Sequence, residues 1–294
     1  MALAAFQNGG LELVYETHGI LNEAGDNCVL LPTYYTGTHA SYSLMIGPGR
    51  VLDPARYFIV SPNMLGNGVS SSPSKNHEFS NATVADNVHL QHRLLSTLGV
   101  REIKLLYGWS MGAMQGYSWA AIYPAMVKNF LAVCGSARCW PLNRVFLEGI
   151  AAAMGHDNDR RAFGRCYAGW AYSAAFYRDE LYKLLGYETL EAFLKFWEDD
   201  HLGFDARDLM AMLWTWKNAD LDDAALAKIS ARTIIMPADT DMYFTVDEAR
   251  VEAAAIGHAE VRPLYSPYGH CAGAPGQFPA ETALIEAAMR ELLA

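Results

Sequence analysis

The 294-residue chain lacks the features of several common functional classes. It has no run of basic residues, and 32 acidic residues outweigh 22 basic ones, which gives a formal net charge of −10. This charge balance argues against nucleic acids or anionic membrane surfaces as partners. No stretch of 18 uncharged apolar residues occurs, so the sequence predicts no transmembrane helix.

Cysteines are also few, and none of the five belongs to a C-x-x-C pair. This odd, scattered set predicts neither a zinc site nor a disulfide framework. The opening residues, MALAAFQNGG, contain no basic segment followed by an apolar segment and a cleavage site, so we expect no signal peptide. These features are typical of a reduced, cytoplasmic protein.

What the chain does contain is 52% hydrophobic residues, arranged as short apolar runs that alternate with helical patterns. Strands are predicted at 11–18, 28–31, 58–60, 103–107, 127–134, 233–236 and 261–265. Helices are predicted at 83–98, from 111 to just before Pro124, at 246–256 and at 279–293. This alternation predicts an α/β fold, with a mostly parallel sheet that helices cover on both faces.

Residues 136–230 interrupt the alternation with a helical segment that is rich in aromatic residues. The aromatic residues of interest there are Trp140, Trp170, Trp197, Trp214, Trp216, Tyr167, Tyr172, Phe176 and Tyr177. Most of them should form a helix–helix core, and two or three should line an apolar pocket. We therefore predict a core domain of residues 1–135 and 231–294, with an inserted helical cap of residues 136–230.

One stretch organises the rest of the sequence. The apolar run 103–107 leads into Gly108-Trp109-Ser110-Met111-Gly112, and a helical pattern follows. Gly-x-Ser-x-Gly between a strand and a helix is typical of a nucleophile elbow, whose tight turn exposes the serine hydroxyl. The N–H of Met111, at the start of the helix, would point to where an oxyanion forms. Ser110 is thus the predicted nucleophile, and the alternative is a serine in an ordinary strand–helix turn.

A serine nucleophile needs a histidine base, and the base needs a carboxylate that orients it. Later loops offer Asp239 or Asp241 and then His270, each after an apolar strand, so they should meet at one edge of the sheet. His258 lies before its strand, at the wrong end. The two aspartates point the same way in an extended segment, so spacing cannot choose between them. Asp241 is preferred because the apolar residues 242–244 should anchor it, whereas Asp239 could organise the turn.

The second oxyanion donor should come from the loop after the strand at 28–31. A backbone N–H near Tyr34 or Tyr35 is the candidate. The side chains of Tyr34 and Trp109 are expected to form walls of the substrate pocket.

These motifs resemble those of the homoserine O-acetyltransferase-like branch of the α/β-hydrolase fold superfamily. The elbow at 108–115, GWSMGAMQ, is similar to that branch's G-G-S-M-G-G-M-Q, and 268–270 resembles its G-H-D loop. Residues 241–244 resemble its D-x-L-F segment, which implies Asp241 as the acid. Thr36-Gly37 resembles the T-G of its oxyanion loop, which implies Tyr35 as the second donor. Residues 204–206 resemble its F-D-A-N segment. The resemblance implies an α/β-hydrolase fold and a homodimer formed through the cap.

Some positions depart from that branch. Trp109 replaces an elbow glycine, and the glycine-rich stretch 66–74, expected to be a surface loop near the site, differs from the branch's K-G-T-T-G-like loop. We expect a serine hydrolase that cleaves a small ester, amide or thioester through an acyl-enzyme, with no metal or organic cofactor. The alternative is an acyl-CoA-dependent O-acyltransferase with the same first half-reaction. A third possibility is a non-catalytic binding protein on this fold.

Overall fold

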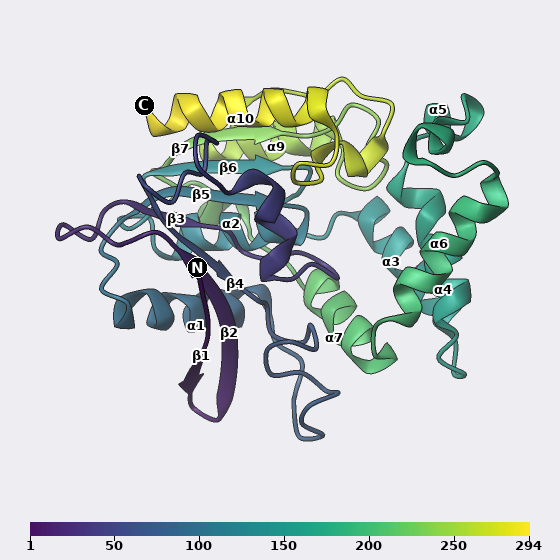
Figure 1. Ribbon diagram of the computed structural model, residues 1–294, viewed down its shortest axis with the longest axis horizontal. Coiled ribbons are helices and arrows are strands. Elements are labelled where there is room, and N and C mark those ends of the chain that lie inside the picture. The colour runs from purple at the N-terminus through teal and green to yellow at the C-terminus, as the bar shows by residue number, and fades with distance from the viewer.

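A computed structural model describes residues 1–294, and an eight-stranded sheet forms its centre (Figure 1). The strands lie in the order β1-β2-β4-β3-β5-β6-β7-β8. β2 pairs antiparallel with β1 and β4, and the other neighbours pair parallel. The strands are β1 (Ala2–Asn8), β2 (Leu11–His18), β3 (Cys28–Leu30), β4 (Phe58–Pro62), β5 (Ile103–Trp109), β6 (Asn129–Val133), β7 (Arg232–Met236) and β8 (Glu260–Val261).

The predicted strands at the apolar runs are confirmed, and the bounds of β2 to β7 agree with them to within a few residues. The prediction for the last strand was wrong in extent, because β8 contains only two residues and pairing resumes as a single bridge between Leu264 and Ala238. Arg262 and Leu264 donate to the carbonyls of Ile235 and Pro237, but Pro237, just after β7, has no N–H to donate back to Arg262, so the ladder is interrupted there. β1 was not predicted, and its residues are exposed or half-buried at the edge of the sheet.

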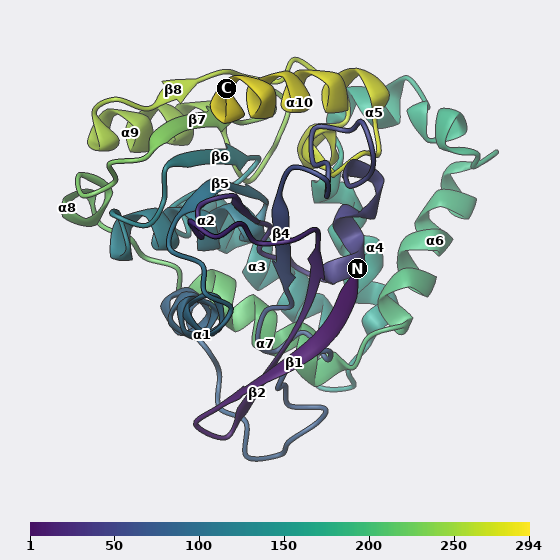
Figure 2. The ribbon, with the colours of Figure 1, turned by 60° about the vertical axis from the view of Figure 1, so that its left-hand side comes forward.

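Helices cover both faces of the sheet, as predicted. One face carries α1 (Val84–Thr97), α2 (Met111–Ile122), α8 (Asp223–Leu226) and α9 (Val246–Ile256), and the other carries α10 (Pro279–Leu293) and the 3-10 helix η1 (His39–Met45). Figure 2 shows strands β5 to β7 between α10 and α1. Side chains of β5 alternate between the two layers: Leu106 packs toward the first, and its neighbours Leu105 and Tyr107 pack toward the second.

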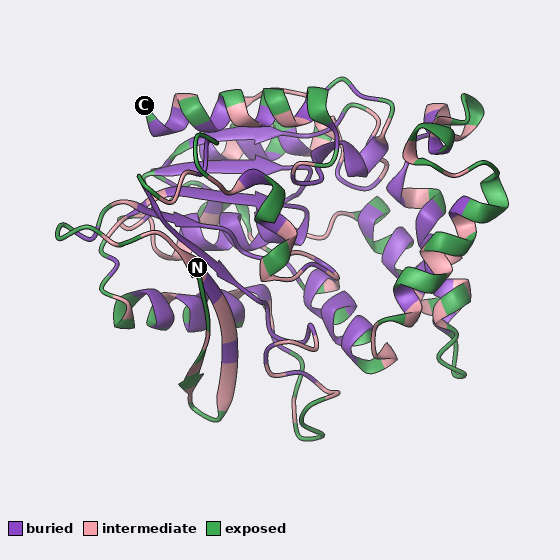
Figure 3. Cartoon of the chain, in the orientation of Figure 1, coloured by how far each residue is buried: buried purple, intermediate pink, exposed green.

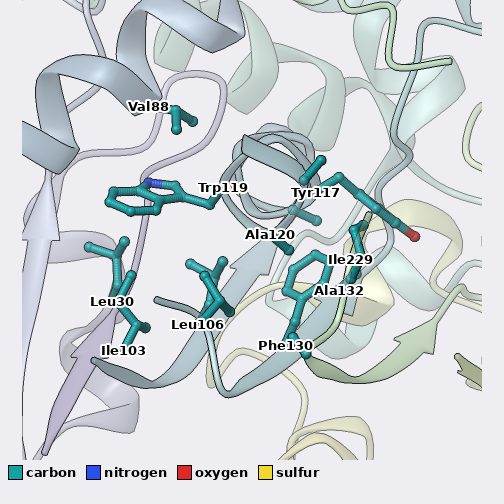
Figure 4. Packing of buried hydrophobic residues seen from close by; sticks show 14 of the residues in the cluster. Leu30, Val88, Ile103, Leu106, Tyr117, Trp119, Ala120, Phe130, Ala132 and Ile229 are labelled. Atoms are coloured by element: carbon teal, nitrogen blue, oxygen red, sulfur yellow. The ribbon is translucent and has the colours of Figure 1, made fainter. Parts of the chain in front are cut away.

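A chain of buried amide hydrogen bonds crosses the first layer. The indole ring of Trp119 packs among Val88 and Leu30 (Figure 4), and its N–H donates to Oε1 of Gln91 at 2.8 Å. Nε2 of Gln91 donates to Oε1 of Gln115 at 2.6 Å, and Nε2 of Gln115 donates to the carbonyl of Thr33 at 2.6 Å. This chain ties α1 and α2 to the loop that follows β3.

The segment between β6 and α8 forms helices that lie to one side of the sheet (Figure 1). These are α3 (Pro141–Met154), α4 (Arg160–Ala171), α5 (Ala174–Arg178), η2 (Leu181–Leu185), α6 (Leu190–Leu202) and α7 (Ala206–Lys217). Figure 3 shows their buried faces turned inward and their exposed faces turned outward. Their apolar side chains share one cluster with Met111 and Met114 of α2, so the helices pack onto the start of the elbow helix. No helix of the protein is long and apolar enough to cross a membrane.

Two connecting segments join these helices to the sheet, and they pair with each other through Arg138 and Asp220. Glu252 of α9 is fully buried beneath this junction. Its Oε1 accepts from the N–H of Ala137 at 3.0 Å and from Nε1 of Trp140 at 2.8 Å, whereas Oε2 has no partner. Burial raises the pKa of Glu252 to about 7.

The stretch 66–74 is not the surface loop that the sequence suggested. Asn67, Ser70 and Ser72 are buried. Asp208 of α7 accepts hydrogen bonds from both the N–H and the hydroxyl of Ser74, at 2.9 and 2.5 Å. The polar composition of this stretch reflects these internal hydrogen bonds rather than contact with solvent.

Candidate active site

Ser110 occupies the sharp turn between β5 and α2, with φ 57° and ψ −128°. The turn depends on its flanking glycines. A Cβ atom on Gly108 would lie 2.2 Å from the carbonyl carbon of Gly112, and one on Gly112 would lie 2.5 Å from the carbonyl oxygen of Pro32. Since real Cβ atoms do not approach this closely, the backbone can make this turn only with glycine at both positions.

His270 and Asp241 form a buried pair. Nδ1 of His270 lies 2.8 Å from Oδ2 of Asp241, and their side chains are 4% and 0% exposed. An ionised carboxylate only accepts, so Nδ1 carries the proton and Nε2 is left free to accept one. Oδ1 of Asp241 accepts from the N–H groups of Tyr243 and Phe244, at 3.0 and 3.1 Å. Both carboxylate oxygens are therefore held in place.

The other candidates from the sequence have structural partners elsewhere. Oδ1 of Asp239 accepts from the N–H of Ser266 at 2.9 Å, and its own N–H donates to the carbonyl of Leu264 at 2.9 Å. Asp239 thus organises the turn after β7. His258 contacts the carbonyl of Ala231 at 3.0 Å, just before β7 begins. The structure therefore places Asp241, and not Asp239, beside His270.

A cavity of about 330 Å³ brings five of the predicted site residues together, and Asp241 and Met111 lie outside its lining. Its walls include Ser110, His270, Tyr34, Tyr35 and Trp109. The remaining lining residues are Thr36, Leu44, Tyr167, Ala171, Tyr172, Phe196, Trp197, Asp200, His201, Tyr243, Cys271, Ala274, Pro275 and Gln277. No lysine or arginine is among them. A larger hollow of about 670 Å³ lies between the turn after β1 and α1, and none of the predicted site residues lines it.

Three of the nine aromatic residues singled out in the helical segment line this cavity: Tyr167, Tyr172 and Trp197. This confirms the expectation that two or three would do so. Phe196 and the polar neighbours Asp200 and His201 were missed. No sequence signal distinguishes them, because α6 presents these residue types on several of its sides and only the tertiary packing decides which side faces the cavity.

The N–H groups of Tyr35 and Met111 have no acceptor within the protein. Met111 is the first residue of α2, so no carbonyl of the helix lies behind its N–H. Tyr35 precedes Thr36, whose φ of 60° is unusual for a β-branched residue. The Tyr35 side chain points away into the helical segment, where its hydroxyl donates to the carbonyl of Leu209 at 3.3 Å. Its backbone N–H is therefore available to a bound group.

Tyr34 and Trp109 form one aromatic wall. Their ring centroids lie 4.4 Å apart in an edge-to-face arrangement, and Trp109 in turn stacks on His270 at 5.0 Å. Burial raises the pKa of Tyr34 to about 12, so its hydroxyl is neutral near pH 7. No group of three or more His, Cys, Asp or Glu side chains in the protein is arranged to hold a metal ion.

Comparison with known families gives this geometry a context. Residues 29–273 match the alpha/beta hydrolase fold family. The chain belongs to this family. This α/β hydrolase is 35% identical over 291 residues to an ethyl acetate hydrolase from Pseudomonas veronii, with 88% of this chain and 83% of that protein covered. It is also similar to the crystal structure of an acetylester hydrolase from Corynebacterium glutamicum, at 30% identity and a TM-score of 0.90, covering 96% and 90% of the two chains.

The resemblance to homoserine O-acetyltransferases is confirmed as well. A homoserine O-acetyltransferase from Carboxydothermus hydrogenoformans is 37% identical over 157 residues. That match covers 46% of this α/β hydrolase and 41% of the relative. A homoserine O-acetyltransferase from Methanococcus vannielii matches 88% of the chain at 26% identity, whereas the ethyl acetate hydrolase matches the same share at 35%.

Proposed function

We propose that this α/β hydrolase cleaves small, uncharged carboxylic esters through an acyl-enzyme, with Ser110 as nucleophile, His270 as base and Asp241 as the acid that orients it. The observation that carries the proposal is the buried His270–Asp241 pair, whose histidine lines the same cavity as Ser110. The names of the relatives, an ethyl acetate hydrolase and an acetylester hydrolase, support a small acyl group. Amides and thioesters would react by the same steps.

In the first half-reaction the Ser110 oxygen attacks the carbonyl carbon and its proton passes to Nε2 of His270. The negative charge that develops on the carbonyl oxygen would be bound by the N–H groups of Tyr35 and Met111. The protonated His270 is stabilised by Asp241 and then gives its proton to the departing alkoxide. The alcohol leaves and the acyl group remains on Ser110.

In the second half-reaction a water molecule gives a proton to Nε2 of His270 and attacks the acyl carbonyl. The same two N–H groups would bind the second oxyanion. His270 then returns the proton to the Ser110 oxygen, and the carboxylic acid departs. No step requires a metal ion or organic cofactor, since the proton transfers and charge stabilisation all fall to residues of the cavity.

Acyl transfer to an alcohol is the second candidate, because homoserine O-acetyltransferases are among the relatives. The cavity argues against a free amino acid as acceptor. No lysine or arginine lines it, and Asp200 is its only acidic lining residue. An acceptor carboxylate would therefore lose its hydration without gaining a cationic partner. Water, or a neutral alcohol, is the acceptor that this lining accommodates.

We further propose that residues 136–230 act as a cap that limits substrate size. Tyr167, Tyr172 and Trp197, which line the cavity, support this role. A homodimer through this cap would cover exposed apolar side chains on α3 and α7, such as Val145 and Trp214, which are 59% and 36% exposed. Sedimentation at micromolar concentration tests the dimer, and a monomer would refute it. The free thiols of all five cysteines support a reducing, cytoplasmic location.

The decisive experiment compares the wild type with Ser110→Ala. We expect ethyl acetate hydrolysis to fall by several orders of magnitude with little change in melting temperature, because the glycines shape the elbow. A fluorophosphonate should label the wild-type peptide that carries Ser110. Labelling that persists in Ser110→Ala would overturn the assignment. Adding acetyl-CoA with homoserine to the wild type tests acyl transfer separately, and rapid formation of O-acetylhomoserine would favour the second candidate.

A further inference from the structure

Trp109 contacts His270 in two ways. The indole N–H donates to the main-chain carbonyl of His270, with Nε1 and the oxygen 3.3 Å apart. The indole ring also stacks on the imidazole, with centroids 5.0 Å apart and planes inclined by 24°. One side chain therefore contacts both the backbone and the ring of the proposed base.

The other aromatic rings around His270 come from a different part of the protein. Tyr243 and Phe244 lie 4.5 and 5.5 Å from the imidazole, and both belong to the loop of Asp241. They position the histidine relative to its acid. Trp109, by contrast, is the residue immediately before Ser110 in the chain. It is the aromatic contact that positions the histidine relative to the nucleophile.

The surrounding backbone is shaped to accept the indole. A Cβ atom on Gly273 would lie 2.7 Å from Cδ1 and 2.8 Å from Nε1 of Trp109. On another side, the ring of Tyr34 packs edge-on against Trp109 at 4.4 Å. Trp109 is only 9% exposed. With these contacts the indole has little freedom to leave its hydrogen bond to His270.

We propose that Trp109 is a positioning residue that fixes the distance and orientation of His270 relative to Ser110, so that Nε2 can take the serine proton and deliver it to the leaving alkoxide. This inference rests on the roles proposed for Ser110 and His270. Both proton transfers use the same nitrogen: Nε2 must reach Oγ of Ser110 first and the ester oxygen of the substrate second, so it has to stay within hydrogen-bond distance of both. A histidine held only by its acid would make both contacts less often.

The leaving group makes this role measurable. Ethoxide is a poor leaving group and needs the proton from His270 as the C–O bond breaks, whereas p-nitrophenolate departs as a stable anion. Ethyl acetate and p-nitrophenyl acetate form the same acetyl-enzyme, and kcat/KM reports only the steps up to its formation. The ratio of their kcat/KM values therefore isolates proton delivery to the leaving group.

We expect Trp109→Phe, which keeps a ring but removes the N–H, to lower kcat/KM for ethyl acetate about tenfold more than for p-nitrophenyl acetate, a fraction of the ~10²–10⁴ that general acid–base catalysis supplies. For ethyl acetate the loss should fall on kcat rather than on KM. Trp119→Phe is the matched control, because it removes a buried indole hydrogen bond, the one to Gln91, in the layer away from the cavity. It should leave the ratio unchanged.

Gly273→Ala is a second test that keeps the tryptophan and displaces it, and it should change the ratio in the same direction. Equal losses for both esters in Trp109→Phe and Gly273→Ala would overturn the positioning role, since general structural damage affects both substrates alike. That result would leave the proposed function intact. Failure of the proposed function shows differently, as ethyl acetate hydrolysis that survives in Ser110→Ala.

Discussion

The imidazole of His270 meets Asp241 through a single 2.8 Å contact between Nδ1 and Oδ2, whereas Asp239, two residues earlier, uses its carboxylate to hold the N–H of Ser266. Two aspartates of one loop thus have separate partners. In the proposed mechanism Asp241 orients the base, whereas Asp239 joins the loop after β7 to the segment that follows β8.

Replacement of each aspartate by asparagine separates these tasks. Asp241→Asn keeps the shape but can donate to Nδ1, which favours the wrong tautomer of His270, and kcat should fall on the order of 10⁴-fold. Asp239→Asn retains an oxygen that can accept from Ser266, so its kcat should fall far less. Steady-state kinetics with ethyl acetate provide the comparison. An inactive Asp239→Asn beside an active Asp241→Asn would reverse the assignment of the acid.

Gln115 connects the two proposed oxyanion donors. Its Nε2 donates to the carbonyl of Thr33, two residues before Tyr35, and lies 3.4 Å from the carbonyl of Met111. Gln115→Met should therefore loosen the loop that carries the N–H of Tyr35, lowering kcat about tenfold with a smaller effect on KM. It should also destabilise the fold by about 1–3 kcal/mol, since buried hydrogen-bonding groups lose their partner.

Gln91→Met is the control for this prediction. It breaks the same amide chain one link earlier, because Gln91 donates to Gln115 and accepts from Trp119. Its unfolding free energy should fall by a similar amount while kcat stays near the wild-type value. If both variants lose kcat in proportion to stability, Gln115 has only a structural role. Urea denaturation and steady-state kinetics on the same samples supply both quantities.

The buried carboxyl of Glu252 should make the unfolding free energy of the protein depend measurably on pH. Burial raises its pKa from 4.5 to about 7, so the folded protein binds this proton more tightly than the unfolded chain. The stabilisation is fully present below about pH 4.5 and is lost as the pH rises through 7. The lost amount is on the order of 3 kcal/mol. Arg138 opposes the shift and Glu248 adds to it.

Glu252→Gln removes this titration and keeps an oxygen for Ala137 and Trp140. The unfolding free energy of the wild type, measured relative to this variant, should decline between pH 4.5 and pH 8. Groups common to both proteins cancel in the difference. Asp247→Asn, at a 90% exposed side chain on the same helix, should show no such trend. A difference that does not change with pH would mean that folding does not raise the pKa of Glu252.

Most of the sheet and its helices could be predicted from the sequence, because buried parallel strands appear as short apolar runs and helix ends carry recognisable residues. α9 and α10 have the predicted bounds, and Thr83 and Thr245 cap α1 and α9 through their side chains. β1 lacks such a signal, since an edge strand that stays exposed needs no apolar pattern. The shortening of β8 follows from Pro237 on the neighbouring strand end, because a proline interrupts a ladder only where its missing N–H faces the partner strand.

The site residues that could be predicted most directly are those for which the chemistry requires one residue type at one place in the chain. Ser110 and His270 both follow parallel strands, whose carboxyl ends lie at the same edge of the sheet. The order of the motifs along the chain was therefore enough to predict that the two residues lie close together. For the carboxylate, spacing left Asp239 and Asp241 open and the apolar residues 242–244 favoured Asp241; the turn of the loop places Asp241 toward His270 and Asp239 toward Ser266. The side of the cavity formed by the helices between β6 and α8 was not predictable. Trp170 and Trp197 both lie in helical patterns, and only the tertiary packing brings Trp197, and not Trp170, to the cavity.

The backbone of Ser110 has a consequence for how this enzyme can evolve or be engineered. A φ of 57° with a ψ of −128° is a conformation that glycine adopts readily and serine does not. Strain of this kind costs about 1–3 kcal/mol. The most stable sequence for this fold and the most active one therefore differ at the proposed nucleophile. A selection for thermal stability alone would favour glycine at position 110, and so would discard the activity before it damaged the fold.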